Sequence, residues 1–126
     1  VPLENLLTES DIVTLHLPYS DQTHHLLNAS NISQIKPGAI LINAARGGLV
    51  DETALDAALS SGHLSAAALD SFEQEPYHGA LCNRDNILLT SHIGSLAKEA
   101  RQRMELEAAE HLLAGLIQSG VIDAVS

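Results

Sequence analysis

The side chain best suited to bind an anion is Arg46, which follows an apolar run and precedes Gly47 and Gly48. A guanidinium group offers a fork of N–H donors that matches the two oxygens of a carboxylate. Two adjacent glycines also let the backbone approach a ligand closely. The same spacing is typical of a structural arginine that pairs with Asp51 or binds a carbonyl group. The local sequence therefore leaves an anion clamp and a structural loop residue as open alternatives.

A second chemically active position is His92, at the tip of a predicted strand and just before Gly94. Imidazole titrates near neutral pH, so a neighbouring carboxylate can hold it as a proton donor. Glu73 and Glu75 in the preceding loop are the candidate neighbours, and solvated loop charge is the alternative interpretation for both. The six other histidines are interpreted as surface or helix-capping residues: His16, His24, His25, His63, His78 and His111.

The sequence disfavours three other kinds of site. A metal centre is disfavoured because His24 and His25 are adjacent and no H-E-x-x-H or paired-cysteine spacing occurs. Nucleophilic hydrolysis is disfavoured because Ser71 and Ser91 lie outside any G-x-S-x-G pattern. The glycine-rich G-x-G-x-x-G loop that cradles a dinucleotide phosphate is also missing from the chain. Anion binding and proton transfer are what remain.

Alternating apolar segments supply the elements that would position these residues. Near-continuous apolar runs predict buried strands at residues 12–17, 39–43, 66–70 and 86–90. Helical spacing predicts helices at residues 3–10, 51–62 and about 95–119, with one helical turn in the polar loop of residues 21–31. Asp51 is the predicted N-cap of the second helix. Its predicted inner face consists of Ala54, Leu55, Ala58 and Leu59.

Strands separated by helices predict an α/β fold, a parallel sheet of about four strands with helices on both faces. Ligands of such sheets bind beyond the carboxyl ends of the strands. The polar residues at those ends are His16, Asn43 with Arg46, Asp70 and His92. The pattern therefore predicts where a site lies before it says what the site does.

Length and composition narrow the class of protein. The chain has 126 residues, enough for one domain, and 45% of them are hydrophobic. Its formal net charge of −10 argues against nucleic-acid and anionic-membrane partners. The single cysteine, Cys82, excludes an internal disulfide and fits a reducing cytoplasm. No apolar run is long enough to span a bilayer, and no signal-peptide pattern is present.

Four segments occur together in a familiar order. They are LHLP at residues 15–18, INAARGGLVD at 42–51, ALDSFEQEP at 68–76 and LTSHIGS at 89–95. In order and spacing they resemble the D-isomer-specific 2-hydroxyacid dehydrogenases, most closely the phosphoglycerate dehydrogenase-like branch. The resemblance covers nearly the whole chain. It implies an oxidoreductase that uses NAD, with NADP as the alternative, on the CH–OH group of a small D-2-hydroxy acid.

The resemblance also implies roles for single residues. Arg46 matches the arginine that grips the substrate carboxylate, His92 the acid/base, and Glu75 the carboxylate that orients the histidine. Asp70 matches the residue that hydrogen-bonds the nicotinamide carboxamide. The implied cofactor-lining positions are His16, Pro18, Ala44, Ala45, Arg46, Asp70, His92, Gly94 and Ser95. No metal site is implied.

Three substitutions depart from the family pattern. Ser91 stands where proline is usual, Ser95 where a second glycine is common, and Ser71 where an apolar residue is usual. A serine at position 91 constrains the backbone before His92 less than proline would.

The family's substrate domain and phosphate loop precede the matching region and have no counterpart in this sequence. We therefore expect residues 1–126 to be the carboxy-terminal portion of a Rossmann-type NAD(P)-binding domain, with little activity in isolation. The strand at residues 12–17 would then have an unpaired apolar edge, which predicts a homodimer or poor solubility. The alternative functions are a non-catalytic binding or assembly module and an inactive fragment of the fold.

Overall fold

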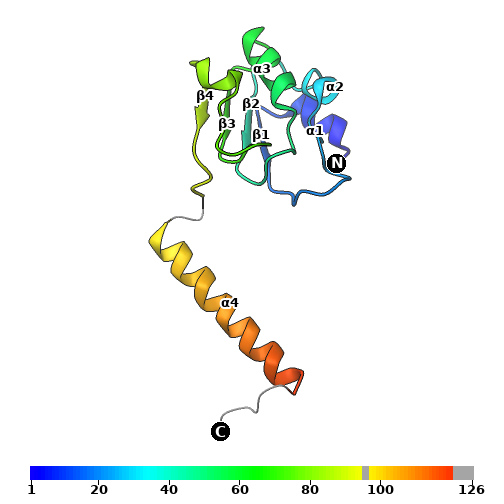
Figure 1. Cartoon of the computed structure of the whole chain (residues 1–126). Coiled ribbons are helices and arrows are strands. Elements are labelled where there is room, and N and C mark those ends of the chain that lie inside the picture. The colour runs from blue at the N-terminus through cyan, green and yellow to red at the C-terminus, as the bar shows by residue number, and fades with distance from the viewer. Residues whose placement is uncertain (95–96, 121–126) are drawn as a thin grey trace. The chain divides into compact units, whose positions relative to one another are not determined.

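A computed structural model describes residues 1–94 and 97–120. The chain divides into two compact units, which we call the sheet unit (Val1–His92) and the helix unit (from Ile93 onward). In chain order the sheet unit contains α1 (Leu3–Glu9), β1 (Ile12–Leu15), α2 (Ala29–Ile32), β2 (Ile40–Asn43), α3 (Glu52–Ser60), β3 (Ala66–Leu69), the 3₁₀ helix η1 (Ala80–Asn83) and β4 (Ile87–Leu89). The helix unit contains α4 (Lys98–Gln118) (Figure 1).

The four strands form one parallel sheet in the order β1-β2-β3-β4. Leu15 pairs with Asn43, Asn43 with Leu69, and Leu69 with Leu89. The carboxyl ends of all four strands therefore lie along one edge of the sheet. This arrangement confirms the predicted α/β class and brings the strand-end residues to the same side of the unit.

One face of the sheet packs into the hydrophobic core. Val13, Leu15, Leu41, Ala67 and Leu69 point to this face and are buried. They share the core with apolar residues of the flanking helices, namely Leu7 of α1, Ile32 of α2, Leu55 and Leu59 of α3, and Leu81 of η1. Burial of these aliphatic side chains is the main stabilising contribution to the unit.

Within the sheet unit, the prediction that helices cover both faces of the sheet is wrong. On the second face Ile12 is 57% exposed and Leu88 is 63% exposed. Ile40, Ile42, Ala66 and Ala68 on that face are only half-buried. The apolar runs in the strands predicted two buried faces. In the structure, the helices that connect the strands pack on one face.

The first strand is shorter than predicted and ends at Leu15 instead of residue 17. Its partner in the described sheet, β2, ends at the register position of Leu15, so His16 and Leu17 have no strand beside them among the described residues. The other predicted strands hold to within a residue at each end. The predicted helical turn is α2, whereas η1 was not expected in the long loop after β3.

Helix α3 begins and ends as the sequence predicts. The Asp51 carboxylate accepts hydrogen bonds from the backbone N–H groups of Thr53 and Ala54, each at 3.0 Å. These bonds satisfy two of the donors that a helix start leaves unpaired. On the predicted inner face Leu55, Ala58 and Leu59 are buried and Ala54 is half-buried.

Helix α4 is regular over Lys98–Gln118, while the predicted start at Ser95 lies outside the described residues. Ion pairs at i,i+4 spacing join Arg101 to Glu105 (3.0 Å) and Arg103 to Glu107 (2.8 Å). Two of the larger apolar side chains of α4 are exposed, Met104 at 55% and Leu112 at 65%. Across residues 1–94 and 97–120, no helix is both long and apolar enough to cross a membrane.

Candidate active site

A histidine–carboxylate pair lies at the carboxyl edge of the sheet. His92 follows β4 by three residues, and its Nδ1 lies 3.1 Å from both Oε1 and Oε2 of Glu75. Of the two candidate neighbours of His92, Glu75 is therefore the one in contact. The two side chains are 45% and 39% exposed, so a ligand can reach the pair. The His92 backbone has φ 55°, a left-handed conformation that is uncommon for a residue with a side chain.

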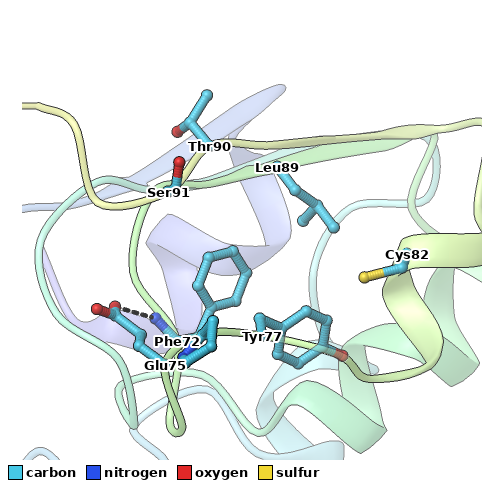
Figure 2. A pocket seen from close by; sticks show the side chains of 8 residues that line it. Phe72, Glu75, Tyr77, Cys82, Leu89, Thr90 and Ser91 are labelled. Atoms are coloured by element: carbon cyan, nitrogen blue, oxygen red, sulfur yellow. Dashed lines mark hydrogen bonds between the residues drawn. The ribbon is translucent and has the colours of Figure 1, made fainter.

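Glu75 is held in its ionised form by two hydrogen bonds. The backbone N–H of Phe72 donates to Glu75 Oε1 at 3.1 Å (Figure 2). This bond, and after it the bond to His92, lowers the pKa of the Glu75 carboxyl. An ionised carboxylate on Nδ1 orients the ring and leaves Nε2 as the ring nitrogen for proton exchange. The pair is thus arranged as a general acid/base.

Arg46 lies in the loop between β2 and α3, and Asn43 shapes that loop. Asn43 is only 2% exposed. Its Nδ2 donates to the Arg46 carbonyl at 2.9 Å, and its Oδ1 accepts from the Ala45 N–H at 3.1 Å. Buried polar groups satisfied in this way fix a loop conformation. The last residue of β2 therefore determines where Arg46 projects.

The Arg46 side chain is exposed, and its Nη1 donates to the Ala45 carbonyl at 2.7 Å. Of the two structural alternatives, the carbonyl contact is present, while the Asp51 carboxylate instead caps α3. A guanidinium group has five N–H donors, so this one bond leaves donors for an anion.

Gly47 brings the Arg46 loop against the segment that carries Glu75. A Cβ atom at Gly47 would overlap the carbonyl group of Phe72 and approach the Glu73 nitrogen. The two backbones therefore touch, and only glycine permits this contact. Because Phe72 also donates to Glu75, backbone contact and hydrogen bonding link the Arg46 loop to the Glu75–His92 pair. The Arg46 side chain itself bonds within its own loop.

Asp70 follows β3 at the same edge and is half-buried. Its Oδ1 accepts a hydrogen bond of 2.6 Å from Thr90 Oγ1, and its N–H donates to the Asn43 carbonyl at 3.0 Å. These bonds connect the ends of β2, β3 and β4. A carboxylate in this position can still accept further N–H donors because each oxygen has two lone pairs.

The other predicted cofactor-lining residues that the structure describes are mostly exposed. His16 is exposed, and its Nε2 lies 3.1 Å from Thr14 Oγ1. Pro18 and Ala44 are exposed and Ala45 is half-buried. Gly94 belongs to the helix unit, and Ser95 lies outside the described residues.

A cavity of about 530 Å³ opens beside Glu75. Figure 2 shows the residues that line it, which are Phe72, Glu75, Pro76, Tyr77, Cys82, Leu89, Thr90 and Ser91. The Phe72 and Tyr77 rings stack with centroids 4.7 Å apart. Sequence reasoning missed this cavity. The one available signal was weak, namely that two of the three aromatic residues fall in one loop.

Sequence reasoning also missed the contact between His25 and Glu73. His25 Nε2 lies 2.9 Å from Glu73 Oε1, and the Glu73 N–H donates to Glu52 Oε1 at 2.8 Å. The His25 and Glu73 side chains are 31% and 37% exposed. The two side chains therefore contact each other while both remain partly exposed to solvent. The pair joins positions 48 residues apart, a separation that no local pattern reveals.

Ser71 is only 3% exposed, and within the described part of the chain its Oγ has no hydrogen-bond partner. Among residues 1–94 and 97–120 there is likewise no group of three or more potential ligands that could hold a metal ion.

Comparisons with known proteins identify the family of the chain. The family model described as D-isomer specific 2-hydroxyacid dehydrogenase, NAD binding domain, matches residues 1–94. D-3-phosphoglycerate dehydrogenase of Escherichia coli (strain K12) is 42% identical over 130 residues, which cover 98% of this chain and 32% of the relative. The chain therefore spans about a third of the length of such relatives.

Two solved structures extend the comparison. A glyoxylate reductase from Paecilomyes thermophila superimposes with a TM-score of 0.88 at 35% identity, covering 95% of this chain and 37% of that one. A D-isomer specific 2-hydroxyacid dehydrogenase from Xanthobacter autotrophicus Py2, in complex with NADPH and MES, superimposes with a TM-score of 0.70 at 45% identity. That match covers 72% of this chain and 30% of the other.

Proposed function

The chain belongs to the D-isomer-specific 2-hydroxyacid dehydrogenase family, and from this premise we propose that it carries the catalytic residues of such an enzyme. The reaction is the NAD(P)-dependent interconversion of a small 2-keto acid and its D-2-hydroxy acid. The observation that carries the proposal is the Glu75–His92 pair at the carboxyl edge of a parallel sheet. This edge is where ligands of α/β sheets bind.

His92 is the proposed acid/base of the reaction. Glu75 holds Nδ1 of the imidazole and thereby orients the ring. In the direction of reduction, protonated Nε2 donates its proton to the keto oxygen, which becomes the hydroxyl group. In the reverse direction neutral Nε2 accepts the hydroxyl proton. General acid–base groups of this kind contribute about 10²- to 10⁴-fold to a rate.

Arg46 is the proposed substrate clamp. Its exposed guanidinium group retains donors for two parallel hydrogen bonds to a carboxylate, beyond the bond to the Ala45 carbonyl. The buried Asn43 holds the backbone of this loop through the Arg46 carbonyl. The loop is therefore ordered before substrate binds, which lowers the entropic cost of binding.

The residues at the strand ends fit the nicotinamide end of the cofactor. Asp70 is a half-buried carboxylate at the end of β3, and a carboxylate accepts the N–H donors of a carboxamide. A bound nicotinamide dinucleotide, NAD or NADP, would supply or take up the hydride. His16, Pro18, Ala44, Ala45, Gly94 and Ser95 are the further positions proposed to line this cofactor.

We further propose that residues 1–126 act as a portion of a dinucleotide-binding domain within a longer enzyme, and that the isolated chain has little activity. The basis is the coverage, since the chain spans 32% of the E. coli relative. A 2-hydroxyacid dehydrogenase also needs a phosphate-binding loop, and no G-x-G-x-x-G sequence occurs here.

A homodimer is the proposed assembly of the isolated chain. The outer edge of β1 has no strand beside it in the described sheet. Near this edge, Ile12 on the open face of the sheet and Leu17 after the end of the strand are 57% and 44% exposed. Unpaired apolar edges associate. Light scattering should therefore report twice the chain mass, whereas a monomer at high concentration would contradict this part of the proposal.

The exposed free thiol of Cys82 supports a reducing cytoplasm as the compartment.

A chimera tests the proposed activity. Residues 1–126 replace the matching third of the E. coli relative, and NADH and NADPH oxidation is followed with glyoxylate and with pyruvate. We expect turnover that falls at least about 100-fold on His92→Ala, in line with the loss of a general acid. His78→Ala is the matched control, because His78 is exposed and lies outside the proposed site. Full turnover with alanine at position 92 would contradict the proposed role of His92, whereas a folded chimera without any turnover would favour a non-catalytic role for this chain.

A further inference from the structure

A loop that the proposed reaction does not use runs alongside the active-site loops. It contains Tyr19 and His25, and its backbone is fixed to the loop after β2 because the His25 N–H donates to the Gly48 carbonyl at 2.7 Å. The Tyr19 ring covers Gly48, where an added Cβ atom would meet the ring at 2.7 Å. The backbone of this loop thus has a firm base from which the His25 side chain can act.

The His25 side chain reaches Glu73, in the segment after β3. Its Nε2 lies 2.9 Å from Glu73 Oε1. The backbone of Glu73 is held separately, because its N–H donates to Glu52 Oε1 at 2.8 Å. Glu73 is therefore fixed at two points, by a side chain from the loop before α2 and by the first residue of α3.

Further groups support His25. The His24 ring stacks on it with centroids 3.9 Å apart. The Tyr19 hydroxyl lies 3.2 Å from His24 Nδ1. The titratable groups around the His25 ring are thus Glu73, Glu52, His24 and, beyond His24, Tyr19. The direct polar partner of the His25 side chain among these groups is Glu73.

Fixing Glu73 fixes the hydrogen bond that orients Glu75. Glu73 is bonded covalently to Phe72, whose N–H donates to Glu75 Oε1 at 3.1 Å (Figure 2). The Phe72 N–H lies one residue before the peptide bond to Glu73, so a displacement of the Glu73 backbone reaches this donor through the Phe72 main chain. We propose that His25 is a positioning residue that acts through Glu73 and Phe72 to hold Glu75 against His92. The catalytic role of His25 rests on the proposed function, whereas the contacts from His25 to Glu75 can be tested without measuring turnover.

Backbone conformation supports the same connection. In the described part of the chain two non-glycine residues have positive φ, namely His25 at 47° and His92 at 55°. Left-handed backbone at residues with side chains persists where surrounding contacts enforce it, and it concentrates at functional sites. Here the two residues lie at the two ends of one chain of contacts, from His25 through Glu73, Phe72 and Glu75 to His92.

The test compares variants of the full 126-residue chain by NMR. In His25→Asn the side chain is too short to reach Glu73, while asparagine tolerates positive φ. We expect hydrogen exchange of the Phe72 amide to accelerate at least tenfold. We also expect the pKa of the Glu75 carboxyl, followed by its side-chain ¹³C resonance, to rise toward its ordinary value, because the Phe72 bond is the main cause of its depression.

Two further variants separate positioning from general stability. His25→Gln restores a donor of similar reach and should return both readouts most of the way to those of the unmodified chain. Arg84→Gln removes the ion pair of Arg84 with Asp56 (2.7 Å), which joins α3 to the residue after η1 and leaves the His25 contacts intact. It should leave the Glu75 resonance unmoved.

Unchanged readouts in His25→Asn, or equal changes in Arg84→Gln, would overturn the inference. Neither result bears on turnover by the chimera. Conversely, full turnover of the chimera with alanine at position 92 would end the proposed function without affecting this linkage. Failure of one proposal is therefore distinguishable from failure of the other.

Discussion

Replacement of Gly47 by alanine probes the contact on which the candidate site is built. The added Cβ atom would overlap the Phe72 carbonyl carbon and oxygen and would crowd the Glu73 nitrogen. All three are backbone atoms of the segment that carries Glu75, so no side-chain rotation can relieve the overlap. The Arg46 loop and the Glu75 segment must move apart in the variant, or the folded state must carry the strain.

The expected magnitude follows from this geometry. Overpacking costs about 1–3 kcal/mol, and backbone overlap lies at the upper end of that range. Alanine recovers up to about 1 kcal/mol by restricting the unfolded chain. The net loss in unfolding free energy is therefore about 2 kcal/mol. For a cooperative unit the size of Val1–His92, the unfolding entropy is about 0.2 kcal/mol/K, so Tm should fall by roughly 10 °C.

Thermal unfolding followed by circular dichroism, together with urea unfolding, measures this loss. Gly115→Ala is the matched control, because a Cβ atom at this position in α4 meets no atom within 4 Å. Alanine in a helix interior should add about 0.5–1 kcal/mol to helix stability. A Gly47→Ala chain that melts within about 2 °C of the unmodified chain would refute the close approach of the two loops and the site geometry that depends on it.

Three further predictions concern stability. Ser71→Ala removes a buried hydroxyl without a partner and should raise the unfolding free energy by about 1 kcal/mol in urea, whereas a loss would show that the hydroxyl is satisfied. Asp51→Ala removes the cap of α3 and should lower the unfolding free energy by about 1 kcal/mol, and a change below a few tenths would contradict the cap. Burial, followed by repulsion from Glu73, raises the pKa of Glu52, so ionisation of Glu52 lowers stability as pH rises through that pKa. The unfolding free energy of Glu52→Gln, relative to that of the unmodified chain, should therefore be higher at neutral than at acidic pH. Urea unfolding of both chains from pH 3 to 8 measures this difference, and a difference that does not change with pH would contradict the prediction.

The sheet and the chemistry at its edge were predictable because their signals are local. Short apolar runs bounded by turns specify β1 to β4, and parallel pairing then brings Asp70 and His92 to one edge. The N-cap at Asp51 follows from residue type and position alone. The partnership of Glu75 with His92 came from the family resemblance, because the residues themselves left Glu73 as an equal alternative.

The remaining features depend on packing between distant segments. The end of β1 is set by the length of β2, which the residues of β1 do not encode. The exposed second face of the sheet reflects which side the connecting helices take, and apolar strands look the same in either case. The His25–Glu73 pair and the approach of Gly47 to Phe72 join loops that only the folded chain brings together.

Binding of a substrate analogue tests the shared site of Arg46, Glu75 and His92 most directly. Oxamate, a small isostere of a 2-keto acid, is titrated into the chimera with NADH present, while the guanidinium resonance of Arg46 and the imidazole resonances of His92 are followed by NMR. We predict that the Arg46 and His92 resonances shift together with one common Kd, and that the resonance of the Glu75 carboxyl shifts with them. Oxamate binding that moves the Arg46 resonance and leaves His92 unmoved, or that gives the two groups different Kd values, would contradict it.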